Sequence, residues 1–271
     1  MIEALFVVAL LAAVVPALPL VPGSGMAGTA LLAAAGAAAL LGIAVALGPG
    51  PAAGVLALPW LVVTITLAIS RLSGMWARRG SLRAFADGLG ADAACAFLAV
   101  GATWALLSRL GLRPMGFEDR IVLLTAVHFH VAGFVLVLVG ELLRRQVAPG
   151  VVAAGLTALV TGIPTTALGF LGVEGAALVG GWFVAVGGIV IGRGHLRAGL
   201  RDSAPALRGP LPAAAGVALL LSMPLAATWA TTSWLGIAFL SVPLMAAVHG
   251  GLNVFGFAVP AVFAWRRATV A

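Results

Sequence analysis

Two short stretches of the chain contain the side chains best suited to chemistry. The first, TAVHFHVAGF, holds His128 and His130, and the second, HGGLNVFGF, holds His249 and Asn253. Imidazole is a natural ligand for zinc, copper and iron, and it exchanges protons near neutral pH. These residues predict either a transition-metal or haem site, with the three histidines as ligands, or a site that binds a polar small molecule.

Helical geometry decides which of these residues can act together. Residues two apart on a helix are turned by ~200°, so His128 and His130 point to opposite sides and cannot chelate one metal as a pair. His249 and Asn253 are four apart and share one face. We therefore expect one of the first two histidines to meet His249, with Asn253 as a hydrogen-bond partner nearby.

A stripe of threonines is a second source of polar groups. Thr157, Thr161 and Thr165 recur at four-residue spacing, and Pro164 beside them frees a backbone carbonyl. The stripe predicts that Thr161 and Thr165 line the same cavity as the histidines. The alternative is that each hydroxyl bonds back to a carbonyl of its own helix.

The composition is that of an integral membrane protein. Of the 271 residues, 62% are hydrophobic and 8% are charged, and the mean hydropathy is +1.18. A soluble domain needs more polar surface than this. The net charge of +7 is carried by arginine alone, which fits cytoplasmic helix ends better than a nucleic-acid surface. We expect the lipid bilayer as a partner and no nucleic acid.

Apolar stretches of about 20 residues, each long enough to cross a ~30 Å bilayer core as a helix, divide the chain. They predict an all-α polytopic transmembrane helical bundle in the cell membrane, as a single domain over residues 1–271. The first stretch, MIEALFVVALL, has no basic region and contains Glu3, so we expect a mature span rather than a signal peptide. The nine expected spans are 3–21, 26–48, 52–70, 88–108, 120–143, 150–172, 174–192, 211–230 and 237–264.

Arginine placement supports nine spans and orients them. Twelve of the 15 arginines follow odd-numbered spans, which places the N-terminus outside and the C-terminus in the cytoplasm by the positive-inside rule. An eight-span arrangement would break this alternation. The twelve are Arg71, Arg78, Arg79, Arg83, Arg144, Arg145, Arg193, Arg197, Arg201, Arg208, Arg266 and Arg267, and the other three are Arg109, Arg113 and Arg120.

This orientation places three histidines at a similar depth. His128, His130 and His249 lie ~12, ~15 and ~14 Å from the outer ends of their spans at the helical rise per residue. Polar groups gathered at one depth predict a shared intramembrane site. No internal repeat can be recognised in the sequence, so the repeat signature of many transporters is missing at this level.

The position of Asp92 depends on where the fourth span begins. A span that begins near Ala84 places this carboxylate inside the membrane, whereas a span that begins near Gly90 leaves it at the interface. Ionisable groups at membrane depth are costly and are functional as a rule. The first case therefore makes Asp92 a site candidate.

Three other polar residues have structural interpretations. Glu141 is expected to pair with Arg144 or Arg145 at the membrane interface. His195 lies in the basic connection 192–210 and is expected to be solvated. Cys95 has apolar neighbours and is expected to be a small packing residue.

The two histidine stretches together resemble a known family. TAVHFHVAGF (125–134) is similar to the central histidine motif of the YndJ-like family of bacterial membrane proteins, and HGGLNVFGF (249–257) is similar to its C-terminal motif. The resemblance implies an integral membrane protein of a poorly characterised family, with His128, His130, His249 and Asn253 as motif residues. Val131 stands where the family tends to have an aromatic residue, so a ring-stacking role at that position has no support.

Three functions fit these observations. The first is an intramembrane metal or haem site, and the lack of a carboxylate near the midplane favours haem or a soft metal over magnesium or calcium. The second is a transporter of a small molecule or proton-coupled solute, because the sixth and ninth spans contain proline beside polar groups. The third is an accessory protein whose histidines hold helices together. Enzymatic activity, the substrate and the oligomeric state are left open.

Reporter fusions test the orientation. Green fluorescent protein fused after Ala271 should fluoresce, because it matures in the cytoplasm, and alkaline phosphatase at the same place should be inactive. Alkaline phosphatase inserted in the 110–118 connection should be active. The opposite pattern at either position would contradict the orientation derived from the arginines.

Overall fold

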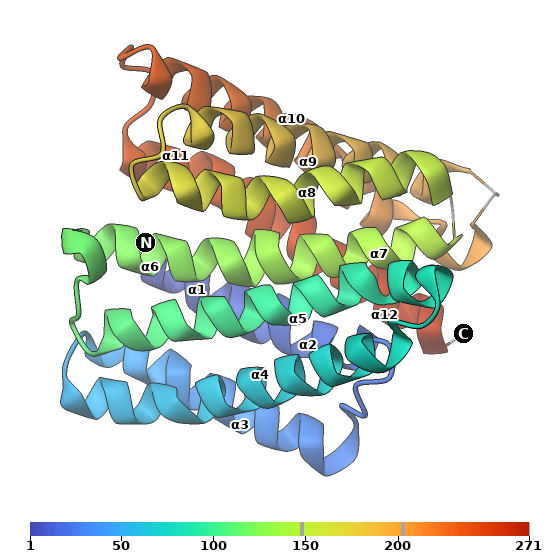
Figure 1. The fold of residues 1–271 in the computed structure, drawn as a ribbon, viewed down its shortest axis with the longest axis horizontal. Helices are drawn as coiled ribbons and strands as arrows, with labels where there is room; N and C mark the ends of the chain where they lie inside the picture. Colours follow the sequence, from blue (N-terminus) through green and yellow to red (C-terminus); the bar gives the residue numbers. More distant parts are fainter. Residues whose placement is uncertain (147–148, 202–203, 271) are drawn as a thin grey trace. The chain divides into compact units, whose positions relative to one another are not determined.

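The computed structural model describes residues 1–146, 149–201 and 204–270, and all the regular structure in these ranges is helical (Figure 1). Nine helices within them are long and apolar enough to cross a membrane. The multi-pass, all-α architecture expected from the sequence is therefore confirmed, together with the number of spans.

Two spans of the first half are built from several helical segments that follow one another without a break. One is the N-terminal span Ile2–Leu20, and the other is Asp119–Gln146. The elements are α1 (Ile2–Ala9), η1 (Leu10–Val14), α2 (Val15–Ala17), η2 (Leu18–Leu20), α3 (Gly28–Leu47), α4 (Pro51–Arg78), α5 (Leu82–Arg109), η3 (Pro114–Gly116), α6 (Asp119–His128), η4 (Phe129–Leu136) and α7 (Val137–Gln146).

The second half contains three unbroken spans and one segmented span, Val242–Thr269. Ser241 begins the segmented span, because its hydroxyl accepts a hydrogen bond from the Leu244 amide at 3.4 Å. The elements are α8 (Pro149–Phe170), α9 (Ala176–Leu200), η5 (Pro205–Leu207), α10 (Pro210–Trp234), α11 (Val242–Gly251), η6 (Leu252–Ala258) and α12 (Val259–Val270).

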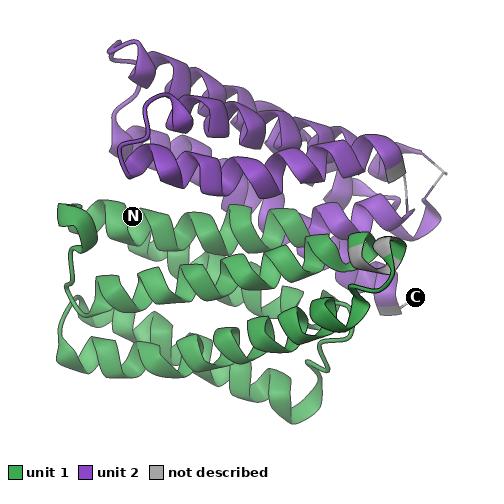
Figure 2. Ribbon diagram, in the orientation of Figure 1, with its two compact units in different colours: residues 1–138 green, residues 139–271 purple. Residues whose placement is uncertain are grey.

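The helices pack as two compact units, residues 1–138 and residues 139–271 (Figure 2). In the first unit α3 packs on α4, α4 on α5, and α5 on α6 and η4. In the second unit α8 packs on α9, α9 on α10, and α10 on η6 and α12. The single domain expected from the sequence stays a prediction.

Three spans contain a π-helical segment: η1, η4 and η6. A π segment adds a residue to the helical turn, which redirects nearby side chains and backbone carbonyls, and such segments are frequent at functional sites. η4 contains His130, and η6 contains Asn253. Two of the motif residues therefore lie where the helix geometry departs from the regular α-helix.

Glycines allow α9 to approach its neighbours at backbone distance. A Cβ atom added to Gly180 would lie 2.7 Å from the carbonyl oxygen of Gly162 on α8. A Cβ atom added to Gly187 would lie 2.6 Å from the carbonyl oxygen of Gly155, also on α8. Membrane helices associate through such close packing, because lipid tails provide no hydrophobic drive between them. The glycines thus fix α8 against α9.

Two helices extend beyond the spans expected from hydropathy, and their ends change the environment of polar residues. α4 continues to Arg78 rather than ending at residue 70, so Arg71 is helical. α9 continues to Leu200 rather than ending at residue 192, so His195 is helical and buried. The expectation of a solvated His195 was wrong. The predicted span ended at residue 192 because arginines follow it, whereas the helix continues past them.

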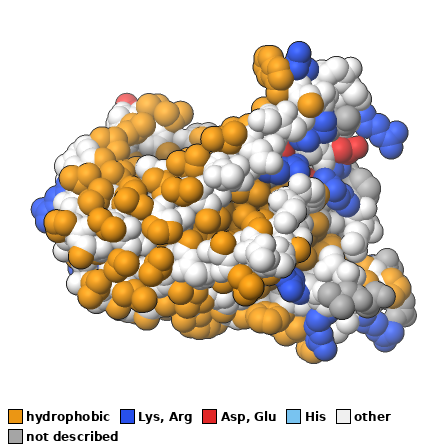
Figure 3. Space-filling model, turned by 90° about the horizontal axis from the view of Figure 1, so that it is seen from below, with side chains coloured by type: hydrophobic (Ala, Val, Ile, Leu, Met, Phe, Trp, Pro, Cys, Tyr) orange, Lys and Arg blue, Asp and Glu red, His pale blue; other side chains and the backbone are white. Residues whose placement is uncertain are grey.

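The outer surface fits a membrane environment. Figure 3 shows a face covered mostly by hydrophobic side chains, with basic side chains at its edges. Large apolar residues are exposed on the helices, among them Leu32, Val62, Val151 and Leu221. A soluble protein rarely exposes so much contiguous apolar surface, whereas lipid tails cover it without cost.

The packing of α8 against α9 predicts a strong effect of Gly180→Ala. The added methyl group would clash with backbone atoms of α8, which cannot move away as a side chain can. We expect a loss of ~1–3 kcal/mol in the free energy of unfolding, typical of overpacking. Thermal unfolding in detergent measures it.

Gly36→Ala is the matched control, because a Cβ atom at this helical position on α3 would have no heavy atom within 4 Å. It should leave stability unchanged or raise it slightly, since alanine is the better helix former. Equal effects of the two substitutions would contradict the close packing.

Candidate functional site

All four histidines lie in the described helices, and each one contacts a backbone carbonyl through Nδ1. A carbonyl oxygen can only accept, so Nδ1 carries a proton in each ring, and Nε2 is the nitrogen with the lone pair whenever the ring is neutral. Three rings donate to the carbonyl four residues earlier in their own helix, whereas His249 donates to a carbonyl of another helix. The pairs are His128–Leu124 at 2.8 Å, His130–Ala126 at 2.8 Å, His195–Ile191 at 3.0 Å and His249–Ser222 at 3.0 Å.

His249 belongs to a small polar network between α10 and the segmented last span. The side-chain amide of Asn253 donates to the His249 carbonyl at 2.7 Å, and the Ser222 hydroxyl donates to Oδ1 of Asn253 at 3.3 Å. Ser222 and Asn253 are buried, and His249 is half-buried. The expectation that His249 and Asn253 share a face is confirmed, because both bond to Ser222.

Local irregularities in both helices explain why this network forms. Asn253 lies in the π segment η6, one turn after His249, so its amide reaches the carbonyl of His249. On α10, Pro224 has no N–H and cannot bond to the carbonyl of Leu220, which loosens the turn that contains Ser222. The π segment and the proline together allow the Ser222 carbonyl and hydroxyl, the Asn253 amide and the His249 imidazole to meet.

His130 is sealed inside the first unit. Nε1 of Trp60 on α4 donates to Nε2 of His130 at 2.9 Å, while Nδ1 of His130 donates to the Ala126 carbonyl. The ring of Phe6 meets the imidazole edge to face at 5.0 Å between centroids. Both ring nitrogens are therefore bonded within the protein, and a metal at Nε2 would have to displace Trp60.

His195 has the same environment in the second unit, which the sequence did not indicate. Nε1 of Trp265 on α12 donates to Nε2 of His195 at 3.2 Å, and Phe257 meets the ring edge to face at 6.3 Å. His195 is fully buried. One signal in the sequence could have indicated this pair. His195 and Trp265 are seventy residues apart, the same separation as that of Trp60 and His130.

The remaining predicted site residues make contacts of their own. His128 is exposed while His130 is buried, which confirms that the two rings point to opposite sides. Thr161 donates to the Thr157 carbonyl at 2.8 Å, and Thr165 donates to the Thr161 carbonyl at 2.7 Å. The threonine hydroxyls thus bond to their own helix, the alternative that the sequence left open.

The structure brings His249 and Asn253 together with Ser222, a residue that sequence reasoning did not select. His128 and His130 belong to the first unit, whereas His249, Asn253, Thr161 and Thr165 belong to the second. Within the described ranges, no group of three or more histidine, cysteine or acidic side chains could hold a metal ion. Metal ligation by His128, His130 and His249 stays a prediction.

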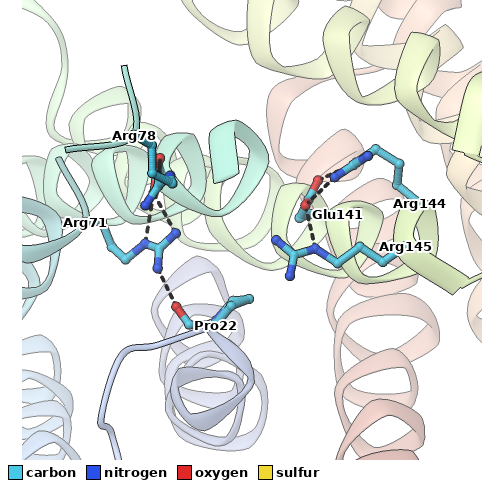
Figure 4. Close-up of polar contacts among 7 residues, drawn as sticks. Pro22, Arg71, Arg78, Glu141, Arg144 and Arg145 are labelled. Carbon is cyan, nitrogen blue, oxygen red and sulfur yellow. Dashed lines mark hydrogen bonds and ion pairs between the residues drawn. The ribbon is translucent and has the colours of Figure 1, made fainter. Parts of the chain in front are cut away.

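Asp92 lies inside α5 and is buried, and the candidate span begins at Ala86, between the two starts that the sequence left open. Its carboxylate pairs with Arg71 at 2.7 Å and with Arg78, both on α4, and Arg71 also donates to the carbonyl of Pro22 (Figure 4). Two arginines around one carboxylate leave a net positive charge. Gly88 makes room for this arrangement, because a Cβ atom there would overlap the Arg78 guanidinium.

Glu141 forms a second buried cluster, in the other unit. It accepts from Nε of Arg144 at 2.9 Å and from Nε of Arg145 at 2.8 Å (Figure 4). The expectation that Glu141 pairs with these arginines is confirmed, and it pairs with both. Both carboxylates are already paired with two arginines, so neither is free to ligate a cation.

The Asp92 cluster predicts a large effect of Asp92→Asn on stability. The substitution would leave Arg71 and Arg78 without a counter-charge in a buried position, which costs ~3–5 kcal/mol in comparable pairs. Chemical unfolding in detergent micelles measures the loss. Asp87→Asn on the same helix is the control, because Asp87 and Arg83 are exposed and 4.0 Å apart, and such pairs contribute ~0–1 kcal/mol. Similar losses in the two variants would contradict the proposed importance of the buried cluster.

The comparisons with known proteins agree with the sequence motifs. A family model described as YndJ-like protein matches residues 4–257, a region that includes both histidine motifs. No curated protein and no solved structure matches the chain. Because the match covers nearly the whole sequence, the chain belongs to the YndJ-like family, and the nine apolar helices found in its described ranges suit a multi-pass membrane protein.

Proposed function

We propose that this YndJ-like protein transports a small polar solute across the membrane, and that Ser222, His249 and Asn253 form its binding site. The observation that carries the proposal is the bond from His249 to the Ser222 carbonyl. The other three histidines donate to their own helices and can do so whatever their neighbours do. His249 instead makes its Nδ1 bond to a carbonyl of another helix, and any movement between α10 and the last span changes that bond.

The chemistry of the network suits a hydrogen-bonding solute. Ser222 and Asn253 offer a hydroxyl and an amide, which donate and accept, and neutral His249 accepts at Nε2 when Nδ1 donates. A solute that bonds to these groups replaces contacts that the helices make with each other. Exchange of this kind lets binding energy alter helix packing, which transport requires.

The backbone around the network supports a moving element. α11 has no buried residue, although it precedes a π segment that is mostly buried. Pro224 and the π segment both weaken regular helical bonding beside the site. In many transporters the substrate site is built from such interrupted helices near the membrane midplane.

A metal or haem site is the second candidate. A histidine whose Nδ1–H is held by a carbonyl presents Nε2 in a fixed orientation, which is the arrangement typical of metal ligands. His128 and His249 both have this bond. His130 fits the role less well because Trp60 occupies its Nε2.

Uptake into proteoliposomes tests the transport proposal. A panel of radiolabelled amino acids, sugars, nucleosides and organic acids should contain at least one solute with saturable, pH-dependent uptake. His249→Ala should reduce that uptake at least tenfold, the equivalent of ~1.4 kcal/mol, because the cross-helix bond is lost. His128→Ala is the matched control and should keep wild-type uptake, since its ring bonds only to its own helix. Full uptake by the His249 variant would contradict the proposal.

The same preparations separate the other candidates. Elemental analysis and an absorption spectrum of purified protein should show bound metal or haem if the second candidate holds, and His128→Ala should then lose it. A colourless, metal-free protein with normal uptake would exclude that candidate. If the histidines serve only to hold helices together, the variants should melt earlier with no change in uptake per folded molecule.

A further inference from the structure

The two π segments η4 and η6 lie at equivalent positions when the two halves of the chain are aligned. They begin at Phe129 and Leu252, 123 positions apart (252 − 129). At that shift His130 aligns with Asn253. Three neighbouring residues are then identical: Val131, Gly133 and Phe134 align with Val254, Gly256 and Phe257.

The three helices before each π span follow the same register. A shift of 123 moves the bounds of α3 to 151–170, those of α4 to 174–201 and those of α5 to 205–232, and it moves the start of α6 to 242. The observed helices at these places are α8 (Pro149–Phe170), α9 (Ala176–Leu200), α10 (Pro210–Trp234) and α11, which begins at Val242. Four successive helices therefore agree to within a few residues.

The packing order within each unit is the same as well. In residues 28–138 each helix packs on the next, ending with α5 against η4, and in residues 151–261 the series ends with α10 against η6. The aligned glycines face the same neighbour in each series. A Cβ atom on Gly133 would lie 2.8 Å from Phe97 of α5, and one on Gly256 would lie 2.7 Å from Ala218 of α10.

The aligned polar residues make the same hydrogen bond. His130 donates to the carbonyl of Ala126, and Asn253 donates to the carbonyl of His249, the residue that aligns with Ala126. Both side chains are buried, and each also accepts a hydrogen bond from another helix. His130 accepts from Trp60 on α4, and Asn253 accepts from Ser222 on α10. An independent origin of these details at one register would be a coincidence.

We infer that residues 28–138 and 151–261 are two copies of one four-helix unit. Each copy holds a central polar group, at position 130 in the first and at position 253 in the second; this group is closed off by Phe6 and Trp60 in the first copy and bonds to the solute in the second. The assignment of the second copy to solute rests on the proposed transport function. An even number of spans per copy gives both copies the same orientation in the membrane, so this is a parallel repeat.

The first copy is closed by residues that have no equivalent in the second. Phe6 on α1, a helix that precedes the first copy, covers the imidazole of His130, and Trp60 occupies its Nε2. In the second copy the residue aligned with Trp60 is Phe183, which has no N–H to donate. The central Asn253 bonds instead to Ser222 and to the carbonyl of His249. The two copies thus have different roles.

Exchange of the π segments tests the repeat. In the first variant, residues 129–136 are replaced by LNVFGFAV, the sequence of 252–259. In the control, the same residues are replaced by GLNVFGFA, the sequence of 251–258, which turns every side chain by about 100° at almost the same composition. The in-register variant should be recovered folded, with a cooperative thermal transition, and the control should be lost to aggregation. Equal behaviour of the two would overturn the repeat.

Uptake by the exchange variants tests the roles of the two copies. The in-register exchange in the first copy should keep the uptake of the wild type. The reciprocal exchange, FHVAGFVL in place of 252–259, should fold but lose uptake, because Asn253 is replaced by histidine. Full uptake by that variant would overturn the assignment of solute to the second copy. If the wild type takes up no solute at all, the transport proposal fails. The thermal unfolding of the in-register variant and its control still tests whether the two copies are a repeat.

Discussion

The absence of water in the bilayer core is the constraint on which the rest of the structure depends. Among the described residues, nearly every buried side-chain polar atom finds a partner within the protein, since none is available from the lipid. The four histidines meet this requirement by donating Nδ1–H to a carbonyl, and the two buried carboxylates meet it with two arginines each. His249 is the one histidine that donates its Nδ1–H to another helix, and for that reason the candidate site is placed there.

The same constraint explains the use of tryptophan in the core. Trp60 and Trp265 each close the second nitrogen of a buried imidazole, so that the ring is fully bonded and neutral. In each unit this bond joins the long helix α4 or α9 to the last span that the unit contains. Such a bond fixes which helices are neighbours, since either partner alone would leave a buried polar atom unsatisfied. The Trp–His pairs are therefore a structural device, and the Ser222–His249–Asn253 network is the exception to it.

Much of the fold could be predicted from the sequence, because the features concerned are local. Hydropathy alone gave nine spans, and the two-residue spacing of His128 and His130 predicted that their rings point to opposite sides, as the exposed His128 and the buried His130 do. The candidate site was only half predicted. Ser222 is a single serine in an apolar run, and its role depends on the turn beside Pro224 and on a π segment that no local pattern predicts. His195 was misplaced because its helix continues past its first arginine, and the internal repeat was missed because only a few residues around η4 and η6 are identical.

Nitrogen NMR of the protein with labelled histidine tests the central claim most directly, since the chemical shifts of Nδ1 and Nε2 report the tautomer and bonding of each ring. The account predicts four neutral rings protonated at Nδ1, of which only His249 changes its shifts when a transported solute is added. A change at His130 or His195 with His249 unaffected would contradict it, because the working site would then lie at one of the sealed rings.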